Sequence, residues 1–201
     1  MPSDLGTIDL YFKDTDGHSE YDRIVAFATG GPEVHVEAYL NGLGLYFSAV
    51  YAPADHSVPP GVHLMPGIDV TGPLWNCIKT PWRLTNEALK WAETRVGMPY
   101  DLEGAVSSAT RRALHRANHY FCSDAAIELL SRCEVTSGST LDPRLIPELL
   151  CPVGLKIAVT SMLSGESRDR TASRLTSHYM QRRSAKGIVS VESFYPELCP
   201  H

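Results

Sequence analysis

The sequence lacks a long hydrophobic run, an excess of basic charge and any pair of cysteines spaced as Cys-x-x-Cys. Without an apolar run of about 20 residues, no membrane-spanning helix is predicted. The N-terminal segment has no apolar core, so no signal peptide is predicted and synthesis in the cytoplasm is expected. The net charge of −5 argues against nucleic-acid binding, which depends on basic surfaces.

The cysteine pattern argues against structural disulfides and against a zinc site. An odd number of cysteines without a secretory signal favours free thiols over a disulfide framework. Zinc sites usually pair closely spaced cysteines, a spacing that is missing here, so neither a metal nor another cofactor is predicted. The cysteines are Cys77, Cys122, Cys133, Cys151 and Cys199.

The order of the predicted elements indicates an α+β fold. The chain of 201 residues is long enough for one sizeable hydrophobic core. Strand-like patterns fill the first half, and helical patterns follow Thr85, Asp101 and Cys122, with the third predicted helix starting at Ser123. Strands followed by helices are typical of the α+β class. The predicted strands are 7–13, 23–28, 35–40, 45–50, 62–64 and 75–79, with an Asn41-Gly42 turn between the third and the fourth.

The composition changes near the C-terminus. From Ser164 onward the chain becomes polar and rich in arginine. We therefore expect one folded domain over residues 1–163 and a polar, basic C-terminal extension over 164–201. A shorter segment lies between Pro143 and Pro147.

One cysteine and one histidine lie in positions suited to nucleophilic catalysis. Cys122 is predicted at the start of a helix, where unpaired backbone N–H groups favour a thiolate and can bind an oxyanion. His35 begins a predicted strand and can serve as the general base. The alternative is that Cys122 is a small buried hydrophobic residue and His35 an ordinary core or surface residue. Taken alone, each residue more often has that structural role.

Two residues are candidates for orienting the His35 imidazole. Glu37 lies two positions further along the same strand, so its carboxylate points to the same face. Ser48 lies on the next strand, within cross-strand reach of His35, but a hydroxyl holds a ring less firmly than a carboxylate does. The sequence leaves both candidates open.

Three segments resemble the NlpC-type branch of the papain-like cysteine peptidases and amidases. Gly97-Met98-Pro99-Tyr100 resembles the Gly-x-Pro-Tyr that precedes the nucleophile in that branch. Phe121-Cys122-Ser123 resembles its Asp-Cys-Ser, with an aromatic residue in place of the aspartate. The 35–40 strand, its turn and Phe47-Ser48-Ala49 resemble the histidine strand and the strand after it. Together the three segments span roughly residues 20–135.

The order of these segments resembles a circularly permuted subgroup, because the histidine comes before the cysteine. That subgroup includes YiiX/YaeF-like bacterial proteins, lecithin:retinol acyltransferase-like enzymes and related phage-encoded proteins. The resemblance implies a permuted papain-like domain over 1–163, with an antiparallel sheet packed against helices. It implies that Cys122 is the nucleophile, that His35 is the base and that Ser48 occupies the third polar position, where Glu37 is the alternative. Tyr100 and Ser123 would contact substrate.

The resemblance implies a thiol hydrolase that cleaves a peptide or isopeptide amide, such as one in peptidoglycan, through an acyl-enzyme. A lipid acyltransferase or thioesterase-like enzyme is one alternative. A papain-like binding scaffold without catalysis is another, and the weak Ser48 favours it. The substrate is thus a small-molecule, peptide or lipid acyl compound. An enzyme acting on peptidoglycan without a signal peptide would need delivery by a virion, a holin or a secretion system. The oligomeric state is not predicted.

The remaining histidines near these segments have no counterpart in the motif. His63, His115 and His119 are therefore predicted to be surface or core residues. His119 is of some interest because it lies three residues before Cys122.

Overall fold

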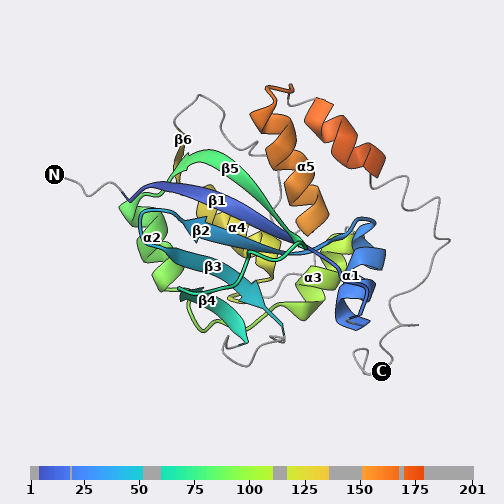
Figure 1. The fold of residues 1–201 in the computed structure, drawn as a ribbon, viewed down its shortest axis with the longest axis horizontal. Helices are drawn as coiled ribbons and strands as arrows, with labels where there is room; N and C mark the ends of the chain where they lie inside the picture. The colour runs from blue at the N-terminus through green and yellow to red at the C-terminus, as the bar shows by residue number, and fades with distance from the viewer. Residues whose placement is uncertain are drawn as a thin grey trace.

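The computed structural model describes residues 5–18, 20–51, 60–110, 117–135, 151–167 and 170–178 (Figure 1). Its strands form one six-stranded sheet in the order β4-β3-β2-β1-β5-β6, and every neighbouring pair is antiparallel. The described part is therefore α+β, with an open antiparallel sheet packed with helices, as predicted. The elements are β1 (Thr7–Asp14), α1 (Glu20–Thr29), β2 (Glu33–Leu40), β3 (Leu45–Val50), β4 (Gly61–Met65), β5 (Trp75–Arg83), α2 (Asn86–Glu93), α3 (Leu102–Thr110), α4 (Cys122–Leu130), β6 (Glu134–Val135) and α5 (Pro152–Leu163).

Alternating apolar residues on the strands make one face of the sheet the hydrophobic core. On β1 and β2 these residues are fully buried, and α4 packs against β2 and β3. In Figure 1, α4 lies behind the sheet and α5 lies beside its upper edge. The buried positions on the two strands are Ile8, Leu10, Phe12, Val36, Ala38 and Leu40.

One predicted strand is wrong and one helix was not predicted. Residues 23–28 form part of α1, and the Gly30 N–H donates to the Ala26 carbonyl at 2.8 Å. A short apolar run contains too few residues to show whether it has the period of a helix or of a strand. Phe27 is 45% exposed, whereas a residue of a buried strand would be covered. Helix α5 begins with Pro152 in its first turn, a position that suits proline.

The helix starts follow the predicted caps. The Thr85 hydroxyl accepts from the Ala88 N–H, and the Asp101 carboxylate accepts from the Gly104 N–H. Helix α4 begins at Cys122, one residue earlier than predicted. The segment between Pro143 and Pro147 lies outside the described residues.

The β2–β3 hairpin and β4 set the register of the site. The loop between β2 and β3 spans residues 41–44, and Gly44 has φ +67°, which favours glycine. Leu40 pairs with Leu45, and Ser48 pairs with His63 on β4. The Val62 N–H donates to the Met98 carbonyl at 2.8 Å, which ties the Gly-Met-Pro-Tyr segment to β4.

The C-terminal extension begins with a helix over 170–178 that contacts the rest of the fold. Leu175 is buried in the core, and Arg174 donates to the Ser161 hydroxyl of α5 at 3.1 Å. His178 Nε2 lies 3.0 Å from the Thr29 carbonyl oxygen at the end of α1. The first part of the extension therefore joins α5 to α1.

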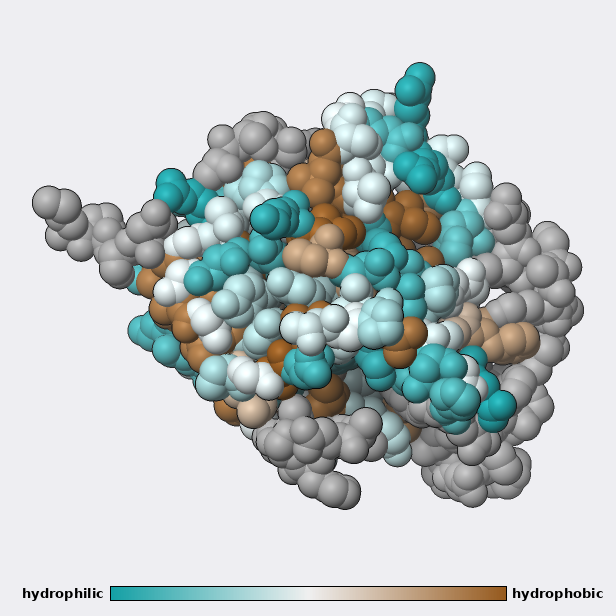
Figure 2. All heavy atoms as spheres, in the orientation of Figure 1, coloured by the Kyte–Doolittle hydropathy of each residue, from teal (hydrophilic) through white to brown (hydrophobic). Residues whose placement is uncertain are grey.

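The described helices are all too short or too polar to cross a membrane. On the face shown in Figure 2, brown hydrophobic atoms form separate patches among teal and pale residues. The four cysteines within the described residues are free thiols, as expected, and Cys199 lies outside them.

Candidate active site

Strand β2 presents His35 and Glu37 on the same face. His35 Nε2 lies 2.7 Å from Glu37 Oε1, and the intervening Val36 points the opposite way into the core. The Glu37 side chain is 3% exposed, whereas that of His35 is 18% exposed. The carboxylate is therefore a fixed internal group, while the ring remains open to solvent on one side.

Helix α4 and the segment before it bring Cys122 to His35. Tyr120 forms a bridge with Tyr100, and the Asp101 N–H donates to the Tyr120 carbonyl at 2.9 Å. These bonds join the Gly-Met-Pro-Tyr segment to the chain that enters α4. The Cys122 thiol then lies beside the His35 ring, close enough to raise the pKa of that ring. Because Nε2 is held by Glu37, the ring nitrogen left for the thiol is Nδ1.

The electrostatics of this cluster favour a charged pair. Burial lowers the pKa of His35, but hydrogen bonds and charge interactions with Cys122 and Glu37 outweigh it and raise the pKa to about 10. Burial raises the pKa of Glu37, but hydrogen bonds from two histidine rings lower it to about 2. At neutral pH the cluster therefore contains an ionised Glu37 carboxylate beside a His35 imidazolium, and this ring faces the sulfur of Cys122.

The second ring on Glu37 belongs to His63, which the sequence analysis assigned to the core or surface. His63 Nε2 lies 3.0 Å from Glu37 Oε2, and His63 is 2% exposed. Its strand β4 is separated from β2 by β3. No local pattern relates positions 37 and 63, so only the strand order could have revealed this contact.

Ser48 does not take the third polar position that the resemblance implied. Its hydroxyl donates to the Val36 carbonyl oxygen at 2.6 Å, and its side chain is fully buried. The ring of His35 is instead held by Glu37, the alternative candidate. The Ser48 hydroxyl therefore adds a bond between β3 and the backbone of β2.

The other residues that the sequence singled out differ in their surroundings. Tyr100 is half-buried, and its ring centroid lies 5.8 Å from that of Tyr51. Ser123 is fully buried, and its hydroxyl has no hydrogen-bond partner among the described residues. His119 is half-buried, with Nδ1 3.1 Å from the Ala117 carbonyl oxygen, and His115 lies outside the described residues. Trp75, which no sequence pattern singled out, lies edge-on to the His35 ring, with the two ring centroids 6.2 Å apart.

The start of α4 offers unpaired backbone donors. Its N-cap residue is Phe121, which makes no side-chain capping bond. The N–H groups of a first helical turn have no partner within the helix, and the helix dipole is positive at that end. An oxyanion that forms beside Cys122 can therefore be stabilised there.

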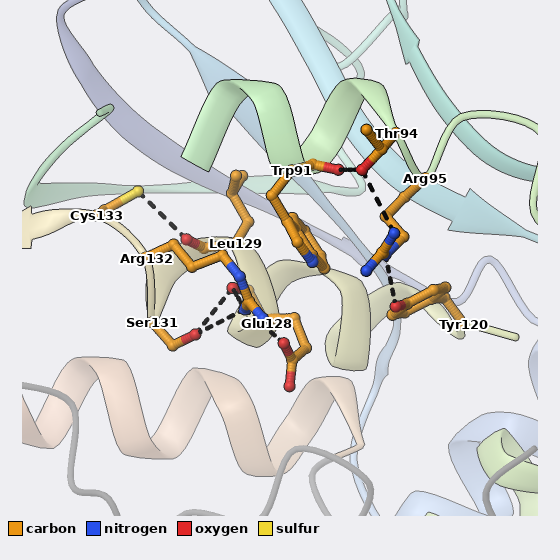
Figure 3. Close-up of polar contacts among 9 residues, drawn as sticks. All are labelled: Trp91, Thr94, Arg95, Tyr120, Glu128, Leu129, Ser131, Arg132 and Cys133. Carbon is orange, nitrogen blue, oxygen red and sulfur yellow. Dashed lines mark hydrogen bonds and ion pairs between the residues drawn. The ribbon is translucent and has the colours of Figure 1, made fainter. Parts of the chain in front are cut away.

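The opposite end of α4 provides a contrast (Figure 3). The Cys133 Sγ donates to the Leu129 carbonyl oxygen at 3.3 Å, and burial raises the pKa of this thiol to about 12. Arg132 lies over the Trp91 ring, 4.5 Å from its centroid, and pairs with Glu128. These contacts hold the C-terminal end of α4 in place, and none of them brings a base to the Cys133 thiol.

Within the described residues, no three histidine, cysteine, aspartate or glutamate side chains are placed to hold a metal ion. The arrangement can instead perform acid–base and nucleophilic chemistry, with a thiol, an imidazole and a carboxylate in sequence. The chain matches no family model, no curated protein and no solved structure.

Proposed function

We propose that this protein is a thiol hydrolase that cleaves an amide through an acyl-enzyme formed on Cys122. The observation that carries the proposal is the contact between the Cys122 thiol and a His35 ring whose other nitrogen is held by Glu37. A nucleophile, a base and a group that orients the base are the three parts of this chemistry. Exposure of the His35 ring on one side gives a substrate access to the base.

The first half of the reaction forms a thioester. The Cys122 thiolate attacks the carbonyl carbon of the substrate, and the carbonyl oxygen becomes an oxyanion bound by N–H groups at the start of α4. His35 Nδ1 then donates its proton to the leaving nitrogen, and the C–N bond breaks to release an amine. Glu37 accepts from Nε2–H throughout and keeps the ring in position.

The second half regenerates the enzyme. His35, now neutral, accepts a proton from a water molecule whose oxygen attacks the thioester carbon. The second oxyanion collapses, the C–S bond breaks, and a carboxylic acid leaves. The Cys122 thiolate again faces a protonated His35.

We further propose a circularly permuted papain-like fold for this domain. Its support is the order of the parts: a histidine strand comes first, and an antiparallel sheet then packs against a later helix that begins at the thiol. The Gly-Met-Pro-Tyr segment lies beside the chain entering that helix, as the resemblance implies.

Replacing the thiol tests the function directly. We expect Cys122→Ala to abolish release of amines from a panel of muropeptides and acyl amides, with a loss of about 10⁴-fold or more. Cys133→Ala is the matched control because it removes a thiol at the other end of the same helix, and we expect it to retain activity. Equal turnover by the Cys122→Ala variant and the wild type would refute the proposal.

A further inference from the structure

Glu37 lies between two histidines that come from different strands. One carboxylate oxygen faces His35 Nε2 at 2.7 Å and the other faces His63 Nε2 at 3.0 Å. The reaction described above uses only the first of these contacts. His63 reaches Glu37 across β3, at the place where the short, fully buried Ser48 pairs with it. The contact between His63 and Glu37 thus depends on the short side chain of Ser48, which lies on the strand between them.

The direction of the second hydrogen bond follows from the chemistry of the two groups. An ionised carboxylate can only accept, so His63 Nε2 must carry the proton and donate it. The Nδ1 atom of His63 is buried without a partner among the described residues. That nitrogen is best left as a bare lone pair, since a buried N–H group without an acceptor is rarely tolerated. The contacts therefore assign His63 to its neutral Nε2–H form.

Two donors on one carboxylate restrict its rotation. With a single donor, Glu37 could turn about its last torsion and move the oxygen that holds His35, because such torsions are broad. With a ring on each oxygen, that turn would break the bond to His63 and leave a buried donor unpaired, which is costly. The position of the His35 ring therefore depends on His63 through Glu37.

We propose that His63 is a positioning residue, which holds Glu37 so that His35 keeps Nδ1 directed at Cys122. This inference rests on the proposed function, since it assigns His63 a part in activating the same thiol. A purely structural His63 would fill space in the sheet and leave the reactivity of Cys122 unaffected. The positioning role requires an N–H donor at the Nε2 position, whereas the space-filling role does not.

The tautomer of His63 can be measured in the unmodified protein. Two-dimensional ¹H–¹⁵N spectra of the histidine rings separate the Nε2–H form from the Nδ1–H form. We expect the His63 Nε2 to be protonated at neutral pH, with a slowly exchanging proton. A neutral His63 with its proton on Nδ1 could not donate to Glu37 and would overturn the proposal.

Two substitutions then separate the donor from the volume of the ring. His63→Leu keeps the bulk and removes the donor, whereas His63→Gln places an amide N–H near the position of Nε2. We expect the alkylation of Cys122 by iodoacetamide to slow about tenfold near neutral pH in His63→Leu, with its pH profile displaced toward higher pH. His63→Gln should stay within about threefold of the wild type.

The outcomes distinguish this inference from the proposed function. If Cys122 reacts fast in the wild type and equally fast in a folded His63→Leu variant, the role of His63 is refuted and the enzyme assignment remains. If Cys122 reacts no faster than Cys133 in the wild type, the enzyme assignment itself is refuted. Should His63→Leu fail to fold, the ring spectra and the His63→Gln variant still decide, because slow alkylation in a folded His63→Gln also counts against the donor role.

Discussion

The two ends of α4 each have a cysteine beside them, and their surroundings differ in nearly every respect. Cys122 opens the helix, where the first N–H groups have no partner within the helix itself, and it faces the imidazole of His35. Cys133 follows the last turn, where it donates to the Leu129 carbonyl oxygen, and its thiol pKa is raised to about 12 by burial (Figure 3). Both residues are cysteines beside the same helix, so the difference between the two thiols comes from their neighbours.

The charged groups near the two ends also differ in their solvent exposure. Glu37 is almost fully buried and bonds to a ring on each oxygen. Glu128 at the other end pairs with Arg132 on the same helix surface, and both side chains are 30% exposed. An exposed pair of this kind contributes less than about 1 kcal/mol. A buried carboxylate that loses a partner costs several times more, which makes Glu37 the group that tolerates change least.

The largest expected difference between the two ends is in thiol reactivity. At neutral pH, a thiol with a pKa of about 12 is ionised in about one molecule in 10⁵. We expect iodoacetamide to modify Cys122 at least about 10²-fold faster than Cys133, as measured by peptide mass spectrometry over time. Similar rates at the two cysteines would show that the contact with His35 does not activate the thiol.

A smaller difference is expected from removing the charge of each glutamate. Glu37→Gln replaces the oxygen that holds His35 or turns an amide N–H toward it, so the ring loses its fixed acceptor. We expect turnover and Cys122 alkylation to fall about 10²-fold. Glu128→Gln removes an equal charge at the far end of α4 and should change both rates by less than about twofold. If Glu128→Gln were as damaging as Glu37→Gln, general destabilisation rather than orientation would be the cause.

The smallest expected difference is in the pH dependence of stability. The raised pKa of His35 contributes stability that is fully present below about 6.5 and is lost as the pH rises through about 10. The lowered pKa of Glu37 contributes stability that is present above about 4.5 and is lost as the pH falls through about 2. Urea unfolding at a series of pH values measures both effects.

Variants test whether His35 causes the alkaline loss of stability. His35→Gln should reduce the alkaline loss in the free energy of unfolding by about 1 kcal/mol or more, because the glutamine side chain has no proton to release. Cys133→Ala should leave the loss between pH 6.5 and about 8 as it is, because the stability linked to the Cys133 thiol is lost only as the pH rises from its ordinary pKa of about 9 toward about 12. An unchanged alkaline profile in His35→Gln would mean that other groups produce the loss.

Much of the fold and part of the site follow from local patterns. Alternation along β1 and β2, the Asn-Gly turn and the caps at Thr85 and Asp101 are all confirmed, because each depends on residues close together in the chain. The same is true of the pair His35 and Glu37, since a spacing of two on a strand puts both side chains on one face. The strand predicted over residues 23–28 was wrong for the opposite reason: this apolar run covers less than about two helical turns, which is too short to show whether its period is that of a helix or of a strand.

The sequence by itself determined the α+β class, the strand that presents His35 with Glu37, and a cysteine at the start of a helix. Only the tertiary structure decided that Glu37 rather than Ser48 holds the ring, and that His63 holds Glu37. The physical reason is that side-chain direction on one strand is a local property, whereas contact across β2, β3 and β4 depends on the order and register of the strands. The same applies to the thiols of α4: the helix put Cys122 at its start and Cys133 just beyond its end, and the sheet placed the His35 ring beside Cys122.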